Sequence, residues 1–227
     1  MNLIKTPLAI ATFMAAAMLA PSLAQAEGLS FNIGAVSLYK SNGVDQDSPV
    51  RNKHSQPAIQ GGVDYAFGSG FYVGNWNSTG RFDNADVEID LYGGYRGEIS
   101  KDLSFDVGYV RYVYPDQADW NGNELYGSLS YGIFTAKLTR GTTGSIDEHS
   151  RLSLSLAQPL TDLLKLNAAV GFRNTANGNS GANDYSLGVS YDFGNDLGAS
   201  ATLSGAETSK VGDAGKARLV LGISKSF

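Results

Sequence analysis

The stretch of sequence that decides the fold is the end of the chain, residues 217–227, which reads ARLVLGISKSF. Counting back in twos from the terminal aromatic gives an almost entirely apolar set, Phe227, Lys225, Ile223, Leu221 and Leu219. The positions between them carry small or polar side chains, with Val220 as the exception. Since side chains alternate across a strand, the pattern predicts a strand with one apolar face and one polar face. Taken alone it fits any amphipathic edge strand, and it is also typical of the strand that closes an outer-membrane β-barrel.

The start of the chain, residues 1–26, predicts a signal peptide. One basic residue precedes the apolar stretch 7–20, and the segment ends in the small-x-small sequence AQA. This is the layout of a secretory signal that is cleaved before Glu27. A membrane-spanning helix is the competing interpretation, but Pro21 interrupts it and its apolar core is shorter than the roughly 20 residues that a span requires. The sequence therefore predicts one exported domain over residues 27–227.

The composition narrows the class of protein. The chain has 17 Lys and Arg against 22 Asp and Glu, and loss of the signal peptide makes it slightly more acidic, which argues against nucleic acid as a partner. It has no Cys, so it forms neither disulfides nor thiolate metal sites. Its 28 Gly and 12 Tyr, against only 6 Pro, suit a single β domain of alternating strands.

Alternating apolar and polar positions predict an all-β fold of twelve strands. We expect them over residues 29–39, 57–67, 71–78, 87–97, 103–114, 123–131, 133–140, 150–158, 164–173, 184–193, 197–204 and 217–227. The turns after the even-numbered strands are short, whereas the connections after the odd-numbered strands, such as 40–56, 79–86 and 205–216, are longer and polar. This arrangement predicts a closed antiparallel transmembrane β-barrel with short periplasmic turns and longer extracellular loops. A soluble β-sandwich has a similar strand density but no reason to sort its loops in this way.

The alternation also predicts which face meets lipid. Along residues 151–157 every second residue is Leu, with Arg, Ser and Ala between. Together with the export signal, the loop order and the terminal Phe227, this places the apolar face toward lipid and the polar face in a wet lumen. Lipocalin-like soluble barrels have the reverse arrangement. Aromatic residues beside the predicted short turns indicate a girdle at the membrane interface; they are Phe67, Phe71, Phe105, Tyr131, Phe134, Phe193 and Phe227.

Two groups of charged side chains point into the lumen by the same alternation. The earlier strands supply an acidic wall, Asp64, Glu88, Asp90, Asp106 and Glu124. The later strands supply a basic wall, Lys137, Arg151, Lys165, Arg173 and Arg218. Facing walls of opposite charge would create a transverse field that orients small polar solutes and sets ion preference. The alternative is that these residues pair across the lumen and fill it as a plug of salt bridges.

The central segment resembles a known family. It carries, in order, Gly74-x-Trp76-x-Ser78, EIDLYGGY at 88–95, DVGYVRYVYP at 106–115 and Glu124-x-Tyr126. These motifs resemble the TorF family of outer-membrane porins, most densely over residues 70–131. The resemblance implies a small outer-membrane barrel with a pore. Elsewhere only the strand pattern and the chain ending agree with the family.

No catalytic centre is predicted. The two histidines, His54 and His149, fall in predicted external loops, and a lipid hydrolase would need a Ser–His pair with an orienting partner. His149 and Ser150 are adjacent, so on a strand their side chains would point to opposite faces. The sequence has no phosphate loop, no metal-ligand spacing and no dinucleotide motif. We therefore expect no enzyme, no metal and no cofactor.

The predicted function is passive diffusion of small hydrophilic solutes across the outer membrane of a Gram-negative bacterium. The alternative is a closed barrel whose extracellular loops have a structural or adhesion role. In both cases the expected partners are outer-membrane lipid and the machinery that assembles outer-membrane barrels, for which Phe227 would be the signal. No nucleic acid is expected.

Overall fold

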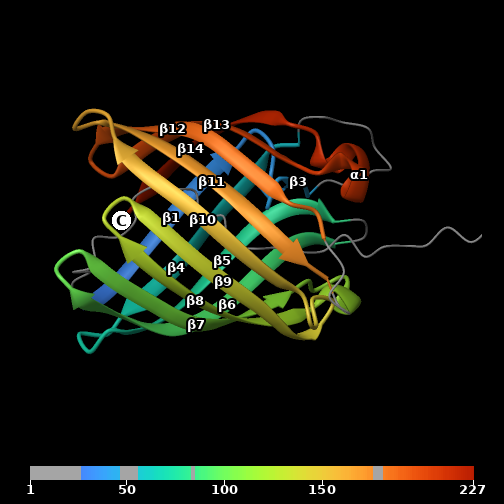
Figure 1. The fold of residues 1–227 in the computed structure, drawn as a ribbon, viewed down its shortest axis with the longest axis horizontal. Coiled ribbons are helices and arrows are strands. Elements are labelled where there is room, and N and C mark those ends of the chain that lie inside the picture. Colours follow the sequence, from blue (N-terminus) through green and yellow to red (C-terminus); the bar gives the residue numbers. More distant parts are fainter. Residues whose placement is uncertain (1–26, 47–55, 83–84, 176–180) are drawn as a thin grey trace, which may run out of the picture.

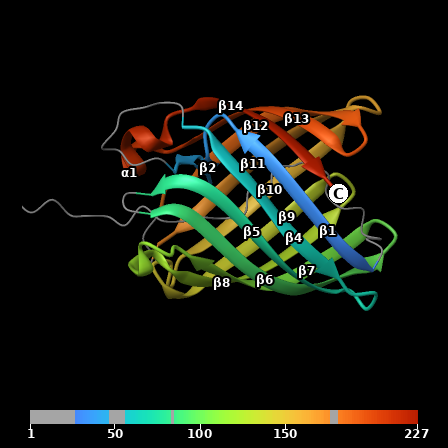
Figure 2. The ribbon, with the colours of Figure 1, turned by 180° about the vertical axis from the view of Figure 1, so that it is seen from behind.

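The protein forms a closed antiparallel barrel of twelve strands, which confirms the predicted fold class (Figure 1, Figure 2). The computed structural model describes residues 27–46, 56–82, 85–175 and 181–227, so the predicted signal peptide lies outside the described residues. Each barrel strand pairs with the next one along the chain. The strands are β1 (Gly28–Val36), β4 (Ala58–Ala66), β5 (Phe71–Phe82), β6 (Ala85–Ser100), β7 (Leu103–Val113), β8 (Gly122–Tyr131), β9 (Phe134–Gly144), β10 (Ser150–Pro159), β11 (Leu164–Asn174), β12 (Asp184–Gly194), β13 (Leu197–Ala206) and β14 (Arg218–Ser226).

The seam of the barrel joins β1 to β14. Ile33 lies opposite Lys225, and one step beyond β14 the backbone of Phe227 makes two hydrogen bonds to Phe31. The Phe227 N–H donates to the Phe31 carbonyl at 2.9 Å, and the Phe31 N–H donates to the Phe227 carbonyl at 3.1 Å. The terminal residue is therefore part of the closing ladder. Closure pairs every barrel strand on both sides, so no strand edge is left open.

The connections between strands define the two ends of the barrel. The turns at 67–70, 101–102, 132–133, 160–163 and 195–196 form the short-turn end, where β1 also begins and β14 ends. The remaining connections form the long-loop end. The prediction of a loop over 79–86 is wrong, because β5 and β6 continue along it until positions 83–84. β-branched Thr79 lies opposite β-branched Val87, a pair that favours strand, and the polar residues around them hid this from the sequence.

Three predicted loops contain short elements of their own. The connection from β1 to β4 holds a hairpin, β2 (Lys40–Ser41) and β3 (Val44–Asp45). The connection from β13 to β14 holds the helix α1 (Thr208–Val211) and the 3-10 turn η4 (Gly212–Gly215), and a second 3-10 turn, η2 (Ala118–Trp120), precedes β8. Within the described part of the chain, no helix is long and apolar enough to cross a membrane.

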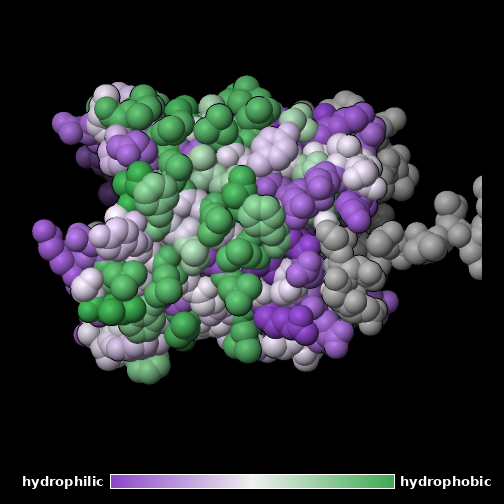
Figure 3. Space-filling model, viewed as in Figure 1, coloured by the Kyte–Doolittle hydropathy of each residue, from purple (hydrophilic) through white to green (hydrophobic). Residues whose placement is uncertain are grey.

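The outer face of the barrel is apolar, as the alternation predicted. Leu154, Leu187 and Leu221 expose 44%, 53% and 53% of their surface, while the residues between them along each strand point inward. In Figure 3 hydrophobic side chains form a band over the strands, and hydrophilic side chains gather toward the long-loop end. A soluble protein would bury such side chains, whereas a hydrocarbon environment stabilises them where they are.

The buried core lies inside the barrel near the long-loop end. It consists mainly of aromatic and small side chains, Tyr39, Ala58, Ala85, Val110, Tyr112, Tyr114 and Ile146. Trp76, Tyr92, Trp120 and Tyr126 pack against it. Aromatic side chains therefore cover much of the inner wall of β5 to β8. These side chains position the charged residues of the lumen.

Candidate functional site in the barrel lumen

The acidic residues near the long-loop end are held by tyrosine hydroxyls. Glu88 is completely buried and accepts hydrogen bonds from Tyr39 at 2.9 Å and from Tyr114 at 3.0 Å, one on each carboxylate oxygen. Glu124 accepts a hydrogen bond from Tyr112 at 3.1 Å. A neutral donor satisfies a buried carboxylate without cancelling its charge. These two carboxylates are therefore held by the hydroxyls of neutral side chains.

Asp90 has no such donor. It lies between Trp76 and Tyr112 in the register of β5, β6 and β7, and only 1% of its surface is exposed. Its Oδ1 atom is buried without a hydrogen-bond partner. Glu88 stands two residues earlier on the same face of β6, so Asp90 shares this part of the lumen with a second carboxyl group. The arrangement is unfavourable for an ionised Asp90.

Two glycines, which have no side chain, leave space on the barrel wall for two more tyrosines deeper in the lumen. Tyr72, Gly94, Gly108 and Tyr126 lie side by side in one row across β5, β6, β7 and β8. The two tyrosines lean toward each other over the glycines until their hydroxyls meet. A methyl group on either glycine would overlap one of these hydroxyls. Tyr72 also donates to Asp106 at 2.6 Å. Two glycines at this position thus allow two aromatic rings to cover four strands.

A tyrosine also reaches over a glycine in a neighbouring row of the sheet. Asp64, Gly74 and Tyr92 are adjacent across β4, β5 and β6, and Tyr92 reaches over Gly74 to donate to Asp64 at 2.5 Å. A side chain on Gly74 would overlap both the ring and the carboxylate.

Two cations then lie against the tyrosine rings. Lys137 Nζ is 4.4 Å from the centre of the Tyr126 ring, a distance typical of a cation–π contact.

Two predicted basic residues on β10 and β11 lie side by side, and one of them pairs with a carboxylate. Arg151 and Arg173 lie opposite each other, and Arg151 reaches over Gly171 to make a bidentate pair with Asp184 on β12, at 2.9 and 2.7 Å. Arg173 is 7% exposed, and its Nη2 atom has no hydrogen-bond partner among the residues that the structure describes. The ion pair of Arg151 is therefore made within the basic side of the barrel, not across the lumen. The remaining predicted residue of this region, Lys165, is half-buried at the short-turn end of β11.

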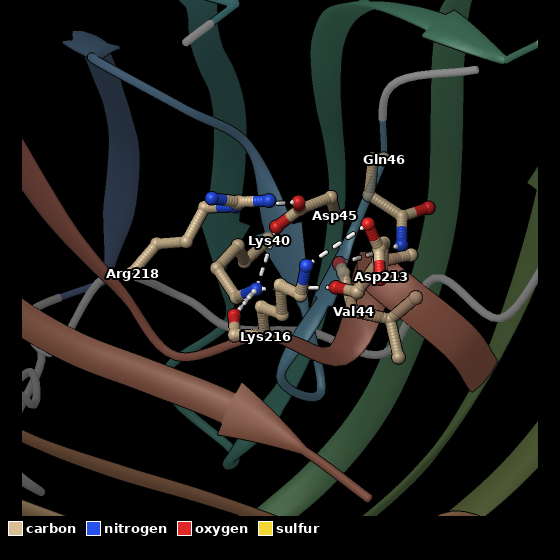
Figure 4. Close-up of polar contacts among 8 residues, drawn as sticks. Lys40, Val44, Asp45, Gln46, Asp213, Lys216 and Arg218 are labelled. Atoms are coloured by element: carbon tan, nitrogen blue, oxygen red, sulfur yellow. Dashed lines mark hydrogen bonds and ion pairs between the residues drawn. The ribbon is translucent and has the colours of Figure 1, made fainter. Parts of the chain in front are cut away.

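Arg218 is bound by a loop residue (Figure 4). Its Nε lies 2.8 Å from Asp45 of the β2–β3 hairpin, and the other oxygen of Asp45 is 2.5 Å from Lys40 Nζ. Lys40 also donates to the carbonyl of Lys216 at 3.0 Å. Gly43, with φ +73°, turns the hairpin and lies directly against Gly205. The hairpin is thus fixed to the β13–β14 connection and to the wall of β14.

Burial shifts the pKa of groups in the connections. Burial, and then the carboxylates of Glu88 and Asp90, raise the pKa of Tyr39 well above its ordinary value, which keeps Tyr39 a donor. Burial lowers the pKa of Lys40, while the adjacent Asp45 partly offsets this. Burial also lowers the pKa of His149, and the positive charges of Arg173 and Arg140 act in the same direction.

A cavity of about 450 Å³ remains in the lumen. On one side it is lined by the inward residues of β4 to β9, including Asp64, Tyr72, Trp76, Tyr92, Arg96, Asp106, Tyr112, Glu124, Tyr126 and Lys137. On the other side it is lined by small residues of β1 and β14, including Ser30, Asn32, Gly34, Ser224 and Ser226. The volume is in the range of small-molecule sites.

The alternation in the sequence predicts which charged residues face the lumen, but it does not single out the tyrosines that hold them. Tyr72, Tyr92, Tyr112 and Tyr126 occupy the same alternation phase as the predicted acidic residues, so the signal was present. It also missed Asp45, which pattern alone leaves in a polar loop. Among the described residues, no three His, Cys, Asp or Glu side chains are placed to hold a metal. His54 lies outside the described residues, and His149 stands in the β9–β10 connection.

Solved structures with a similar fold are small porins. The KdgM porin has a TM-score of 0.61 at 9% identity, over 87% of this chain and 99% of that chain. The KdgM porin in complex with disordered oligogalacturonate has a TM-score of 0.59 at 8% identity, over 87% and 99%. The NanC porin in a rhombohedral crystal form has a TM-score of 0.57 at 10% identity, over 88% and 99%. At these identities the likeness is one of fold.

The remaining comparisons concern sequence. Comparison with curated proteins finds no match. A family model described as a bacterial protein of unknown function, Gcw_chp, matches residues 23–227, which include the whole barrel. The chain therefore belongs to the Gcw_chp family.

Proposed function

We propose that the protein is a porin-like channel through which small hydrophilic solutes diffuse across the bacterial outer membrane. The observation that carries this proposal is a closed barrel that is apolar outside and holds a cavity lined by charged and aromatic side chains within. Such a barrel satisfies all its backbone groups in hydrocarbon and leaves a wet interior. The fold likeness to the KdgM and NanC porins and the resemblance to the TorF family support it. No catalytic role is proposed.

The orientation follows from the order of the connections. In outer-membrane barrels the short turns face the periplasm, so we place the short-turn end there and the β2–β3 hairpin outside. Residues 1–26 would direct export, and Phe227 would be read by the barrel assembly machinery. The exposed aromatic residues at the short-turn end, such as Phe71 and Phe193, would stand at the lipid interface.

A second candidate function has a specific observation in its favour. Glu88, Asp90 and Tyr114 are almost inaccessible to solvent, which is the condition of packed side chains rather than of an open pore wall. If this packing closes the lumen, the barrel is a scaffold and the long loops carry a structural or adhesion role. The cluster of Glu88, Asp90, Tyr39, Tyr112 and Tyr114 is then a plug, held by tyrosines instead of salt bridges.

Conductance in planar bilayers separates the two functions. The mature chain, folded in detergent and shown to be folded by a gel shift on heating, is added to a bilayer in potassium chloride. Stepwise conductance of the wild type supports the channel. A silent wild type, combined with conductance of a Glu88→Ala/Tyr114→Ala variant that still shows the gel shift, supports the closed scaffold and contradicts the channel.

A further inference from the structure

Four of the charged residues that the sequence predicted for the lumen border this cavity, namely Asp64, Asp106, Glu124 and Lys137. Its acidic side is the acid–tyrosine wall, defined as Asp64, Tyr72, Tyr92, Asp106, Glu124 and Tyr126. Next to it, across the pairing of β4 with β1, is the small-residue wall, defined as Ser30, Asn32 and Gly34 of β1 with Ser224 and Ser226 of β14. The free space therefore lies against β1 and β14, because their small side chains leave the lumen unfilled.

Three arginines of the predicted basic wall stay apart from this space, whereas Lys137 lines it. Among the described residues that line the cavity, Arg151, Arg173 and Arg218 do not occur. Arg151 is turned to Asp184, at 2.7 Å, and Arg218 is turned to Asp45, at 2.8 Å. A solute in the cavity thus meets the acid–tyrosine wall directly.

The charges of the lining favour a cation. Its carboxylates are Asp64, Asp106 and Glu124, and its cations are Arg96 and Lys137. Both cations lie on ring faces: Arg96 Cζ is 4.9 Å from the centre of the Tyr72 ring, and Lys137 Nζ lies over Tyr126. The carboxylates accept from neutral tyrosine hydroxyls, which leaves their charge and further lone pairs for a donor in the cavity.

The rings add a second means of recognition. Trp76, Tyr92 and Tyr112 also line the cavity, and aromatic faces attract organic cations as well as apolar groups. A carboxylate beside aromatic faces in a small cavity is suited to an ammonium group on a short organic chain. An organic anion would instead meet three carboxylates against two cations, Arg96 and Lys137, and the tyrosine hydroxyls that could donate to it already donate to the carboxylates.

We propose that this cavity is a binding site for small amine-bearing solutes, whose ammonium group is held by the carboxylates of the acid–tyrosine wall, and that the barrel prefers cations. The proposal rests on the proposed channel function for its physiological meaning. The site itself is a property of the folded barrel, so its binding can be measured without a membrane.

Binding of n-butylammonium chloride and sodium butyrate to the detergent-folded full mature chain tests the site. The two probes have the same carbon chain and opposite charge, and calorimetry measures both. We expect butylammonium to bind at least tenfold more tightly than butyrate. Asp106→Asn and Asp64→Asn should each weaken butylammonium binding about tenfold, because each removes one negative charge from the lining of the cavity.

The matched control is Asp192→Asn on β12. Asp192 is an inward carboxylate at the short-turn end that accepts from the Gly194 N–H at 2.7 Å and does not line the cavity. This variant should bind butylammonium as the wild type does. Equal binding of butyrate and butylammonium overturns the proposal, even if both aspartate variants fail to fold. An equal loss in Asp192→Asn also overturns it, since that indicates a diffuse field instead of a site.

Reversal potentials in a potassium chloride gradient keep this proposal distinct from the channel proposal. A cation-selective wild type that loses selectivity in Asp106→Asn supports both. Specific butylammonium binding without any conductance supports the site and contradicts the channel. Conductance with anion selectivity, together with no preference for butylammonium, supports the channel and contradicts the site.

Discussion

The two sides of the lumen treat their charged residues in different ways. On the acid–tyrosine wall, carboxylates accept hydrogen bonds from tyrosines, as Asp106 does from Tyr72, and their charge is retained. On the arginine side, which we define as Arg151, Arg173 and Arg218 with their partners, the charge of Arg151 and of Arg218 is neutralised by a carboxylate. A hydrogen bond to a neutral group keeps a field in the lumen, and an ion pair removes it. In the proposed channel the first arrangement sets ion selectivity, and the second holds strands and loops together.

The largest expected effect comes from breaking the ion pair of the arginine side. Asp184→Asn leaves Arg151 and Arg173 facing each other across β10 and β11 without a carboxylate. Removing one partner of a buried pair costs about 3–5 kcal/mol, so the barrel should unfold at clearly lower urea concentration, read from the loss of the gel shift. The double variant Arg151→Met/Asp184→Leu removes both charges at similar volume and should stay close to the wild type.

Replacing a carboxylate by an amide on the acid–tyrosine wall should destabilise the barrel much less. Glu124→Gln keeps an acceptor for the Tyr112 hydroxyl, so it should cost no more than about 1 kcal/mol. If Glu124→Gln and Asp184→Asn destabilise the barrel equally, the two sides do not differ in the way described. Ion selectivity should change more in Glu124→Gln than in Asp184→Asn, because Glu124 lines the cavity and Asp184 does not.

The next effect concerns the glycines under the tyrosines. Gly108→Ala places a methyl group where the Tyr126 hydroxyl lies, so the Tyr72–Tyr126 contact must open. We expect a loss of about 1–3 kcal/mol, as for other overpacked sites, and a changed single-channel conductance. Gly127→Ala is the matched control on β8, because a methyl group there meets only Val107, at 3.7 Å. Equal losses in the two variants would mean that β-strand glycine itself, and not the tyrosine, sets the cost.

The fold was largely open to prediction, because strands that meet lipid on one face and water on the other must alternate. All twelve barrel strands begin or end within a few residues of their predicted places, and the inward phase of Asp64, Asp106 and Glu124 came from the same rule. The partners of these residues did not follow from it. Alternation gives the face of a residue, but the reach of Tyr72 over Gly94 depends on the register between strands, which the sequence of one strand does not contain.

The contacts made by loop residues also could not be predicted from the sequence. The polar composition of residues 40–56 predicted a long external loop and no contacts within it, and the structure shows that Lys40 and Asp45 form a buried ion pair that fixes the β2–β3 hairpin. Asp45 also takes Arg218, which the alternation had assigned to the basic pore wall. Such a contact joins residues far apart in the chain. No local pattern carries it, so the predicted wall and the observed one differ at this point.

Releasing the hairpin should have a smaller and more local effect. Asp45→Asn removes the shared carboxylate of Lys40 and Arg218, and burial already lowers the pKa of Lys40. The hairpin should open locally at a cost of about 1–2 kcal/mol while the barrel persists, seen as faster amide exchange at Ser41 and Val44. The freed Arg218 should shift the reversal potential toward anions. Unchanged exchange and unchanged selectivity would show that the hairpin is held by packing alone.

The smallest effect is a pH dependence from His149, which lies beside the arginine side. Burial and the charges of Arg173 and Arg140 lower its pKa in the folded protein, while in the unfolded chain it is about 6.5. Below pH 6.5 the unfolded state therefore binds more protons than the folded state, and stability falls as the pH falls. Because His149 is only half-buried and solvent screens it, the loss should stay below about 1 kcal/mol. His149→Gln should remove this part of the pH dependence between pH 7 and pH 5, measured by urea unfolding at both values. A variant that keeps the full wild-type slope would assign the dependence to other groups and leave the arginine side without a pH-sensitive neighbour.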